Sequence, residues 1–369
     1  MKLMIVLGAR PQIIKSAPII HEALKYREIE LQLIHTGQHY DFNMSKIFFG
    51  ELDLPDPLIN LGVGSGTHAF QTGKMMIGLE DVIQKLKPNL VMVPGDTNST
   101  LAGALTAAKL NVPVAHVEAG ARSYDMRIPE EVNRRLTDHC SQILFAPTQN
   151  CALNLSKEGL SKDQVYVSGD SMYDALLQHL PSALKCDVLD KFDLRKEKYG
   201  LLTLHRPENV DDPVKLSNII RAMIKIENLT IVFPVHPRTK MRLSSEDLPK
   251  IEKKASNFTL LDPVGYNSML SLISNAKIVF TDSGGVQKEA FWLHTPCVTI
   301  RESTEWVETL QLGANTLAKC DEADIIQKTK KLLTTKDLRK KLRNLPNPFG
   351  EGQASVKIID IIKKGINEG

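Results

Sequence analysis

The sequence predicts an α/β protein built from two doubly wound parallel-sheet domains with a cleft between them. Short apolar runs alternate with longer amphipathic segments along the chain, which is typical of parallel strands whose sheet is covered by helices on both faces. The 369 residues suffice for two domains at about 150 residues each. A charge-rich segment at 180–199 has no strand character and separates two series of apolar runs.

The candidate strands are short apolar runs bounded by polar or turn residues. In the first series they are Met4–Leu7, Leu31–His35, Leu90–Val93, Val114–Val117, Ile143–Ala146 and Val165–Val167. In the second series they are Leu201–Leu204, Ile231–Pro234, Phe258–Leu261, Lys277–Thr281 and Pro296–Ile300. We therefore expect five or six strands in each sheet.

Helix-length amphipathic segments lie between these runs. Examples are Pro18–Tyr26, Ala69–Leu86, Thr100–Lys109 and Pro213–Ile226. After a break at Leu345–Gly350, the pattern predicts a last helix at about Ala354–Lys364. The expected domains are residues 1–172, joined by the C-terminal helix at about 353–369, and residues 173–352.

Composition and charge limit the classes of function. The chain has 46 Lys and Arg against 43 Asp and Glu, and a net charge of +3 is too small to predict nucleic-acid binding. No run of about 18 apolar residues predicts a membrane span, and the N-terminus looks like a first strand rather than a signal peptide. The five cysteines are scattered, which predicts a reduced, cytoplasmic chain with no metal site.

Ligands of open α/β sheets bind at the carboxyl ends of the strands, so the loops that follow strands are the most informative. The first such loop, Gly8–Lys15, offers Arg10 and Lys15 at the start of a helix, where a phosphate or carboxylate would be favoured. The alternative is that Arg10 pairs with a carboxylate of the fold and Lys15 is solvated.

Carboxylates follow two further strands. Asp96 comes after one strand, where the pattern of any one residue taken alone favours the simpler interpretation that Asp96 or Thr97 is the N-cap of the next helix. Glu118 comes after another strand, where a carboxylate has no obvious packing role. The pair Glu130 and Glu131 opens a helix and could simply form ion pairs four residues ahead. The sharper hypothesis is that Asp96, Glu118 and one glutamate of the pair converge for acid–base chemistry.

The second half carries its own anion-binding candidates. His205 and Arg206 follow one strand and His236 follows the next. In Thr281–Glu289 a strand runs into Ser-Gly-Gly and then a helix, so the backbone N–H groups there can approach a diphosphate. One glycine would suffice for a tight turn. Two glycines followed by Glu289, a candidate acceptor for sugar hydroxyls, favour a nucleotide. Arg301 follows the next strand.

Together these motifs resemble the non-hydrolysing UDP-N-acetylglucosamine 2-epimerases over essentially the full length of the chain. The matching segments are Gly8–Lys15, Thr36–His39, Gly95–Thr100, His116–Arg122, Pro129–Asp138, His205–Asn209, Val235–Pro237, Thr281–Glu289 and Asn347–Gly352. The resemblance implies a GT-B-like architecture of two Rossmann-like domains, with the C-terminal helix crossing back to the first domain. It also implies a homodimer.

The resemblance implies an isomerase that acts on UDP-N-acetylglucosamine without NAD or any other cofactor. Such enzymes eliminate UDP to give 2-acetamidoglucal and then add UDP back with the proton delivered to the opposite face of C2. The product, UDP-N-acetylmannosamine, would serve polysaccharide biosynthesis. By motif matching the implied catalytic residues are Asp96, Glu118, Glu130 and His205. The implied substrate-binding residues are Arg10, Lys15, Arg134, Met269, Ser283, Gly284, Gly285, Glu289 and Arg301.

The chain departs from the family pattern at two binding positions. Met269 stands where many bacterial members carry an aromatic residue near the uracil. A second, activating UDP-sugar site is matched by Gln38, His39, Gln71, Arg206 and His236. Phe70 stands where that site usually has an arginine, so the expectation of allosteric activation is weakened.

Several alternatives stay open. A near neighbour is the 2-epimerase of UDP-2,3-diacetamido-2,3-dideoxy-glucuronate, whose carboxylate could meet Arg127 or Arg301. A GT-B glycosyltransferase would use the same nucleotide end but would need one base rather than three carboxylates. A hydrolysing relative would release free UDP, and a nucleotide-sugar sensor would have no use for the carboxylates. We expect a cationic cleft for one diphosphate, formed by Arg10, Lys15, Arg122, Arg134, His205 and Arg301.

Overall fold

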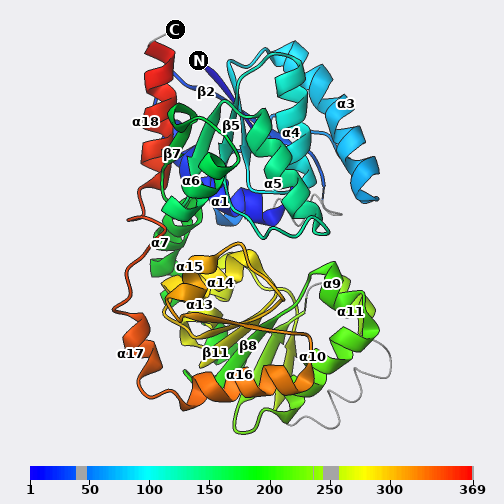
Figure 1. Ribbon diagram of the computed structural model, residues 1–369, viewed down its shortest axis with the longest axis vertical. Helices are drawn as coiled ribbons and strands as arrows, with labels where there is room; N and C mark the ends of the chain where they lie inside the picture. Colours follow the sequence, from blue (N-terminus) through cyan, green and yellow to red (C-terminus); the bar gives the residue numbers. More distant parts are fainter. Residues whose placement is uncertain (39–47, 236, 244–256, 368–369) are drawn as a thin grey trace. The chain divides into compact units, whose positions relative to one another are not determined.

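The computed structural model describes residues 1–38, 48–235, 237–243 and 257–367 (Figure 1). The chain forms two compact units, of which unit 1 is Met1–Gln178 with Asn347–Gly369 and unit 2 is His179–Pro346. Each unit holds one wholly parallel sheet flanked by helices. The predicted α/β class with two doubly wound parallel sheets is therefore confirmed.

Unit 1 contains a seven-stranded sheet in the order β3-β2-β1-β4-β5-β6-β7. Its strands are β1 (Lys2–Leu7), β2 (Glu30–His35), β3 (Ile59–Asn60), β4 (Leu90–Pro94), β5 (Val114–Val117), β6 (Ile143–Ala146) and β7 (Val165–Val167). Its helices are α1 (Arg10–Ala23), α3 (His68–Leu86), α4 (Asn98–Lys109), α5 (Pro129–Cys140), α6 (Gln149–Lys157), α7 (Ser171–Leu184, which runs into unit 2) and α18 (Ala354–Asn367). The sheet has seven strands where five or six were predicted. The additional strand is β3, whose two residues are too few to form a recognisable apolar run.

Alternate side chains of each strand serve opposite faces of this sheet. Met4 and Val6 on β1 join one buried cluster with Met75 and Leu79 of α3 and Ala104 of α4. Helices α3, α4 and α5 pack side by side, while α1 packs against α18. Because helices cover both faces, the strands need apolar residues at nearly every position, and this made them visible in the sequence.

Helix α1 begins earlier than expected, at Arg10 rather than Pro18. Its N-cap is Ala9, which has no side-chain oxygen, so the usual sequence signal of a helix start is missing. Pro18 lies inside the helix, although proline is more typical of a first turn. The expected start at Pro18 was therefore wrong.

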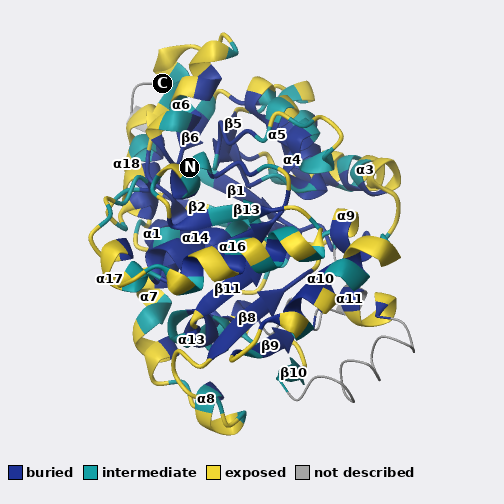
Figure 2. Ribbon diagram, turned by 60° about the horizontal axis from the view of Figure 1, so that its bottom comes forward, coloured by how far each residue is buried: buried dark blue, intermediate teal, exposed yellow. Residues whose placement is uncertain are grey.

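Unit 2 contains a six-stranded sheet in the order β10-β9-β8-β11-β12-β13. Its strands are β8 (Tyr199–Thr203), β9 (Thr230–Pro234), β10 (Phe258–Leu261), β11 (Ile278–Thr281), β12 (Cys297–Ile300) and β13 (Asn315–Ala318). Its helices include α8 (Val188–Lys191), α9 (Pro207–Val210), α10 (Pro213–Lys225), α11 (Pro237–Arg242), α13 (Tyr266–Asn275), α14 (Gly284–Trp292), α15 (Val307–Gln311), α16 (Glu322–Thr334) and α17 (Leu338–Leu342). One core cluster joins α10 and α16 to the sheet. Figure 2 shows the strands as the buried part and the outer helix faces as exposed.

The C-terminal segment is tied to unit 1 by hydrogen bonds near the start of α7. Asp170 N–H donates to Phe349 O at 2.8 Å, and the Asp170 carboxylate accepts from Met172 N–H at 2.9 Å, as an N-cap does. The Asp174 carboxylate accepts from the N–H groups of Ala354 and Ser355 at 3.1 and 2.7 Å. These contacts fix the first turn of α18.

No helix in the described ranges has both the length and the hydropathy that a bilayer crossing requires. Over the same ranges, no three His, Cys, Asp or Glu side chains group as metal ligands would.

Candidate active site

The strand order reverses once in each sheet, and the loops at these two points carry most of the predicted site residues. In unit 1 the reversal lies between β1 and β4, whose following loops begin at Gly8 and Gly95. In unit 2 it lies between β8 and β11, followed by Leu204 and Asp282. Ligands of doubly wound sheets bind at this topological switch point.

Lys15 and Glu118 form a nearly buried ion pair in unit 1. Lys15 Nζ on α1 lies 2.7 Å from Glu118 Oε1 after β5, and the two side chains are only 8% and 9% exposed. Glu118 has a φ of +76°, a left-handed conformation that costs a non-glycine residue free energy and is found most often at functional sites. The alternative of a solvated Lys15 is wrong.

Asp96 is held by Arg134 of α5. Arg134 Nη2 lies 2.6 Å from Asp96 Oδ2, and Asn133 donates to the Asp96 carbonyl oxygen at 2.9 Å. The N-cap of α4 is Thr97, whose hydroxyl accepts from Thr100 N–H at 3.4 Å. The capping alternative thus applies to Thr97, and the Asp96 carboxylate remains partly exposed at 24%.

The turn that carries Asp96 lies against Lys15. Gly95 has a φ of +70°, and a Cβ placed there would lie 3.0 Å from Lys15 Nζ. One ammonium group therefore contacts Glu118 directly and approaches the backbone that precedes Asp96. Glycine serves this turn twice, because it permits the left-handed φ and leaves room for the Lys15 side chain.

The structure separates the two adjacent glutamates at the start of α5. Glu131 is fully buried, and its carboxylate accepts from Ser123 N–H at 2.9 Å, Tyr124 N–H at 3.1 Å and Arg134 Nη1 at 3.1 Å. Glu130 is half-buried, and no hydrogen bond or ion pair joins its carboxylate to another described residue. Glu130 is thus the accessible carboxylate of the pair.

A buried network behind these carboxylates was not predicted from the sequence. His116 Nδ1 lies 2.6 Å from Asp138 Oδ1, and His116 Nε2 lies 2.7 Å from Gly95 O. Arg122 lies 2.6 Å from Asp138 Oδ2 and 2.7 Å from Glu158 Oε2. The expectation that Arg122 belongs to an anion-binding surface is wrong, because its side chain is buried between two carboxylates. A histidine inside an apolar strand was the signal available in the sequence.

Burial disfavours the charged forms in this network, but the ion pairs outweigh it. For Asp138, desolvation acts to raise the pKa, yet His116 and Arg122 hold it below its usual range. For Arg122, burial opposes the positive charge, but Glu158 and Asp138 raise the pKa above its ordinary value. The network is therefore a set of buried, mutually compensating charges.

The loop after β1 is held by hydrogen bonds to the side chain of Gln12. Gln12 Oε1 accepts from Gly8 N–H at 2.9 Å and from Ala9 N–H at 3.1 Å, while Gln12 Nε2 donates to Pro94 O at 3.0 Å. This amide links the ends of β1 and β4. The Arg10 guanidinium lies over the Phe48 ring at 4.4 Å, a cation–π contact that leaves it half-buried near the same strand ends.

In unit 2 the Asp282 carboxylate holds the loop that carries His205. It lies 3.0 Å from His205 Nδ1 and accepts from Arg206 N–H at 3.0 Å and Asn209 Nδ2 at 3.2 Å. Burial acts to raise the pKa of Asp282, but His205 and the Arg206 N–H keep it below its usual range. The His205 side chain is 43% exposed, so its ring is oriented by a buried carboxylate and remains accessible.

Helix α14 begins directly after β11 and the Asp282 turn. Ser283 is its N-cap, with the hydroxyl accepting from Val286 N–H at 3.4 Å, and Gly284 and Gly285 form the first turn. A Cβ on Gly284 would lie 2.4 Å from Glu305 Oε1, so a larger residue there would displace the Glu305 carboxylate. Glu289 lies on the same helix but is 97% buried, at 3% exposure.

Arg301 follows β12 and contributes a buried guanidinium. Its Nη1 lies 2.9 Å from Glu305 Oε2, but without the alignment of a hydrogen bond. Both terminal nitrogens are buried and have no hydrogen-bond acceptor among the described residues. Buried donors without acceptors are unusual, and they favour an anionic ligand there.

The residues matched to an activating site are only partly described. Gln71 Nε2 donates to Gln38 O at 3.2 Å, and Gln38 Oε1 accepts from Ser99 N–H at 3.0 Å, so these two side chains lie together. Arg206 lies in unit 2, 3.9 Å from Glu305. His39 and His236 lie outside the described residues. Met269 is a half-buried residue of α13.

Comparisons with known proteins agree with this architecture. The family model for UDP-N-acetylglucosamine 2-epimerase matches residues 22–363. A UDP-N-acetylglucosamine 2-epimerase homolog of Methanococcus maripaludis is 48% identical, over 98% of this chain and 99% of the relative. The UDP-2,3-diacetamido-2,3-dideoxy-D-glucuronate 2-epimerase of Pseudomonas aeruginosa is 43% identical, over 99% of this chain and all of the relative.

A solved structure gives the same result. The crystal structure of Methanocaldococcus jannaschii UDP-GlcNAc 2-epimerase in complex with UDP-GlcNAc and UDP matches with a TM-score of 0.92 and 47% identity, covering 99% of this chain and all of that one. With a family model over most of its length and several full-length relatives above 40% identity, the chain belongs to the UDP-N-acetylglucosamine 2-epimerase family of isomerases.

Proposed function

We propose that the chain interconverts UDP-N-acetylglucosamine and UDP-N-acetylmannosamine by eliminating and re-adding UDP. A base removes the C2 proton while the C1–O bond to UDP breaks, which leaves a C1–C2 double bond. UDP then adds back at C1, and an acid delivers a proton to the opposite face of C2. The single observation that carries this proposal is the Lys15–Glu118 pair beside the Asp96 turn, at the switch point of the unit 1 sheet.

The proposed acid–base residues are Asp96, Glu118 and Glu130. Two of them lie against cations, Glu118 at 2.7 Å from Lys15 and Asp96 at 2.6 Å from Arg134. Glu130 is the accessible member of its pair. Carboxylates in unlike surroundings suit a reaction that needs one proton acceptor and one proton donor.

The proposed ligands of the uridine diphosphate lie in unit 2, with Arg10 of unit 1 as a further cation. Support comes from the first turn of α14, whose backbone N–H groups and positive helix end favour phosphate. The buried Arg301 donors without acceptors add a second argument. His205, oriented by Asp282, would stabilise the departing diphosphate by donating from its accessible nitrogen. Glu289 is proposed for the ribose.

Incubation of the full-length protein with UDP-N-acetylglucosamine in D₂O tests the reaction type. Because the proton removed from C2 exchanges with solvent, UDP-N-acetylmannosamine should form with deuterium at C2, as read by ¹H NMR and mass spectrometry. Product without deuterium would exclude the elimination mechanism. Accumulation of free UDP and N-acetylmannosamine would point to hydrolysis instead.

A second candidate substrate is UDP-2,3-diacetamido-2,3-dideoxy-glucuronate, because the relative from Pseudomonas aeruginosa is named as the 2-epimerase of that sugar. Arg127 is a poor candidate to bind a sugar carboxylate, since its side chain is 83% exposed and paired with Asp125 at 2.7 Å. Arg301 remains. Side-by-side assays of both UDP-sugars decide, and we expect the higher kcat/KM with UDP-N-acetylglucosamine.

We also propose that catalysis does not require an activating UDP-sugar. Phe70 is 52% exposed and supplies no cation, and the amides of Gln38 and Gln71 already bond to protein groups. Reactions started from pure UDP-N-acetylmannosamine should therefore proceed at once. A lag that a trace of UDP-N-acetylglucosamine abolishes would contradict this proposal.

A homodimer is proposed as the working form. It is supported by apolar side chains that unit 1 leaves exposed on α3 and α5, the two helices that pack on either side of α4, namely Phe70 at 52%, Ile77 at 67% and Leu136 at 48%. Sedimentation equilibrium measures the assembly, and Ile77→Lys should weaken it. A protein that sediments as a monomer at micromolar concentration would contradict the proposal.

A further inference from the structure

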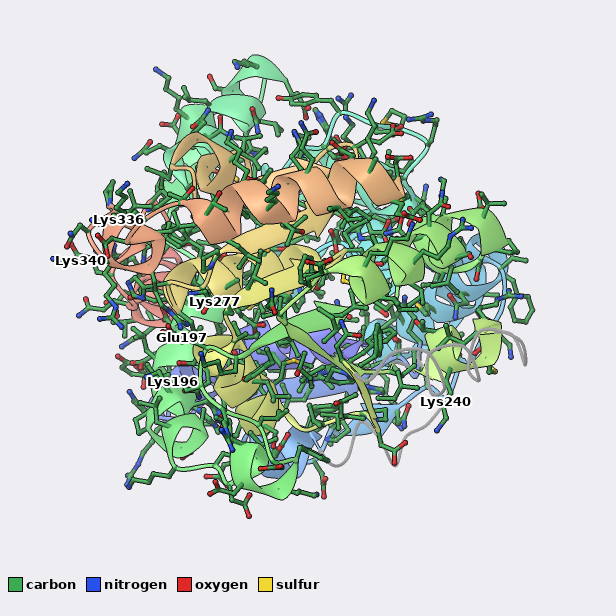
Figure 3. All side chains as sticks on the ribbon, turned by 90° about the horizontal axis from the view of Figure 1, so that it is seen from below. Lys196, Glu197, Lys240, Lys277, Lys336 and Lys340 are labelled. Atoms are coloured by element: carbon green, nitrogen blue, oxygen red, sulfur yellow. The ribbon has the colours of Figure 1, made fainter. Side chains whose placement is uncertain are left out.

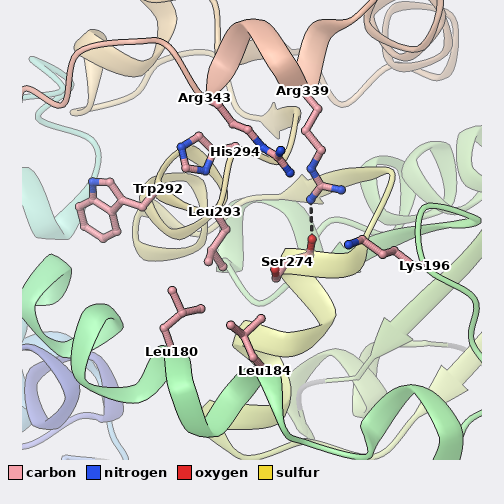
Figure 4. Close-up of a pocket in the computed structure, with 9 residues that line it drawn as sticks. All are labelled: Leu180, Leu184, Lys196, Ser274, Trp292, Leu293, His294, Arg339 and Arg343. Carbon is pink, nitrogen blue, oxygen red and sulfur yellow. Dashed lines mark hydrogen bonds between the residues drawn. The ribbon is translucent and has the colours of Figure 1, made fainter.

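Unit 2 holds a cavity of about 240 Å³ that no part of the proposed reaction uses (Figure 4). Cationic side chains line one side of it, namely Lys196, Arg339 and Arg343, together with His294. Leu180 and Leu184 of α7 face them (Figure 4). Leu184 is 61% exposed, so the cavity has an apolar wall open to solvent opposite a cationic wall.

Arg339 is fixed as part of the cationic wall. It donates to Glu197 Oε1 at 2.9 Å, to Thr295 Oγ1 at 2.6 Å and to Ser274 O. Arg343 lies one turn further along the same chain segment and is exposed. The hydrogen bond from Arg339 is the largest influence on the pKa of Glu197 and lowers it. The positive charges of Arg339, Lys277 and Lys196 lower this pKa further.

His294, which also lines the cavity, is affected by the same cations. Its φ of +58° places it in the left-handed region at the end of α14. Burial lowers the pKa of His294 first, and Arg343 and Arg339 lower it further. Further lysines, Lys277, Lys336 and Lys340, lie along the same side of the unit in Figure 3.

We propose that this cavity binds a small phosphate-bearing ligand, with the phosphate between Arg339, Arg343 and Lys196 and the rest of the molecule against Leu180 and Leu184. Arg343 is exposed and can donate two hydrogen bonds in a fixed geometry to an anion with several oxygens, while Arg339, whose Nη groups already donate within the protein, contributes a fixed positive charge. The volume admits a ligand about as large as a phosphorylated monosaccharide. The site is separate from the residues proposed for catalysis.

Isothermal titration of the full-length protein with inorganic pyrophosphate tests this site, at constant ionic strength and with saturating UDP present to occupy the proposed substrate site. The double variant K196Q/R343Q removes two cations of the cavity. The control K336Q/K340Q removes the same charge from exposed lysines that do not line it. We expect the first pair to weaken pyrophosphate binding about tenfold or more and the control by less than about twofold.

An equal loss of pyrophosphate affinity in both double variants would overturn the proposal, because it would show a general effect of positive charge and not a specific site. So would the lack of saturable binding to the wild-type protein. If UDP itself does not bind, the comparison of the two double variants still decides, because neither pair contains a residue of the proposed active site.

A second inference rests on different contacts, those of Asp138 in unit 1. Its Oδ1 lies 2.6 Å from His116 Nδ1, and His116 Nε2 lies 2.7 Å from Gly95 O, in the turn before Asp96. Its Oδ2 accepts from Gly120 N–H at 3.1 Å, in the turn after Glu118. One buried carboxylate therefore holds the two turns that present candidate catalytic carboxylates.

These turns need such support, since each includes left-handed backbone. The φ angles are +70° at Gly95, +76° at Glu118 and +80° at Gly120. Both ring nitrogens of His116 lie within hydrogen-bond distance of an oxygen, Asp138 Oδ1 on one side and Gly95 O on the other, so the ring links the two. Asp138 also pairs with Arg122.

We infer that His116 and Asp138 are positioning residues for Asp96 and Glu118, an inference that rests on the proposed function. His116→Asn keeps a donor near Nδ1 but loses the bond to Gly95 O, whereas His116→Gln keeps a donor near Nε2. We expect kcat to fall about tenfold to a hundredfold in His116→Asn with KM nearly unchanged, and to recover in part in His116→Gln.

Glu158→Gln is the matched control, because it weakens the outer end of the network at Arg122 without touching either turn. It should reduce stability but leave kcat unchanged. If both His116→Asn and Glu158→Gln lower kcat in proportion to lost stability, the network is only structural and the inference fails. An inactive wild-type protein would instead overturn the proposed function, and this inference with it.

Discussion

At the scale of single residues, the structure divides the carboxylates near α5 by their partners. Glu131 is fully buried and accepts from Ser123, Tyr124 and Arg134, so its charge is used by the fold. Glu130, one residue earlier, is half-buried at the first turn of the helix. Neighbouring residues of the same type thus have different expected roles, although the sequence presents them as equivalent.

We predict opposite effects for these two glutamates. Glu131→Gln should lower the free energy of unfolding by about 1–3 kcal/mol, because buried donors lose a charged acceptor. Glu130→Gln should leave stability nearly unchanged but lower kcat by about a hundredfold, because a proton-transfer group is lost. Urea unfolding and the epimerase assay measure the two effects. Loss of turnover in Glu131→Gln with full stability would reverse the assignment.

The other two proposed acid–base residues can be tested in the same way. Asp96→Asn and Glu118→Gln should each lower kcat by about 10²–10⁴-fold, since each removes a proton-transfer group but keeps the side-chain shape. Glu80→Gln, an exposed change on α3, is the control and should leave kcat unaltered. Deuterium incorporation at C2 is the readout. If Asp96→Asn and Glu118→Gln each left turnover intact, the catalytic assignment would be wrong.

At the scale of secondary-structure elements, the return of the C-terminal segment depends on one carboxylate. Asp174 of α7 accepts from two backbone N–H groups and one hydroxyl at the first turn of α18, which packs on α1. These N–H groups cannot be satisfied within their own helix. The contact joins residues about 180 positions apart in the chain.

Asp174→Ala should therefore destabilise unit 1 by about 1–2 kcal/mol, the usual cost of losing a helix cap. Asp187→Ala is a suitable control, because Asp187 occupies the N-cap position of α8 without a side-chain capping bond. Denaturant unfolding of the two variants gives the comparison. Equal losses of stability would show that the capping contacts contribute little.

The elements also show what sequence patterns can predict. Every predicted strand is confirmed with ends within two residues, because strands buried on both faces are apolar runs with sharp limits. Two strands were missed. β3 has only two residues, and β13 begins with Asn315 and Thr316, whose side chains do not look apolar in the sequence. Asn315 is nevertheless buried and bonded to Thr299 and Gln287.

At the scale of the whole molecule, the sequence predicted which loops form the candidate site but not the buried network of Asp138 that holds two of them in place. Strand order places the loops beginning at Gly8, Gly95, Leu204 and Asp282 at the two switch points, and the polar residues after those strands were visible in the sequence. The Asp138 network joins residues from β5, its following turn and α5. Such a network depends on three-dimensional packing that periodicity does not contain.

Two buried carboxylates have a lowered pKa, Asp138 of unit 1 and Asp282 of unit 2. An unfolded aspartate takes up a proton near pH 4, whereas these two stay charged to lower pH in the folded chain. Between those values the unfolded state binds more protons, so folding stability falls as pH falls. The contribution of each carboxylate should be fully present above about pH 5 and lost as pH falls through its folded pKa.

Asp282→Asn tests this linkage in unit 2. At pH 7 it should cost about 1–3 kcal/mol, because the backbone N–H groups of His205 and Arg206 and the Asn209 amide lose a charged acceptor. The further loss between pH 5 and pH 3 should be smaller than in the wild-type protein, since the group that drives it no longer titrates. Asp262→Asn, whose side chain is 88% exposed, should keep the wild-type slope. Urea unfolding across this pH range measures the slopes, and an undiminished slope in Asp282→Asn would place the acid sensitivity of unit 2 elsewhere.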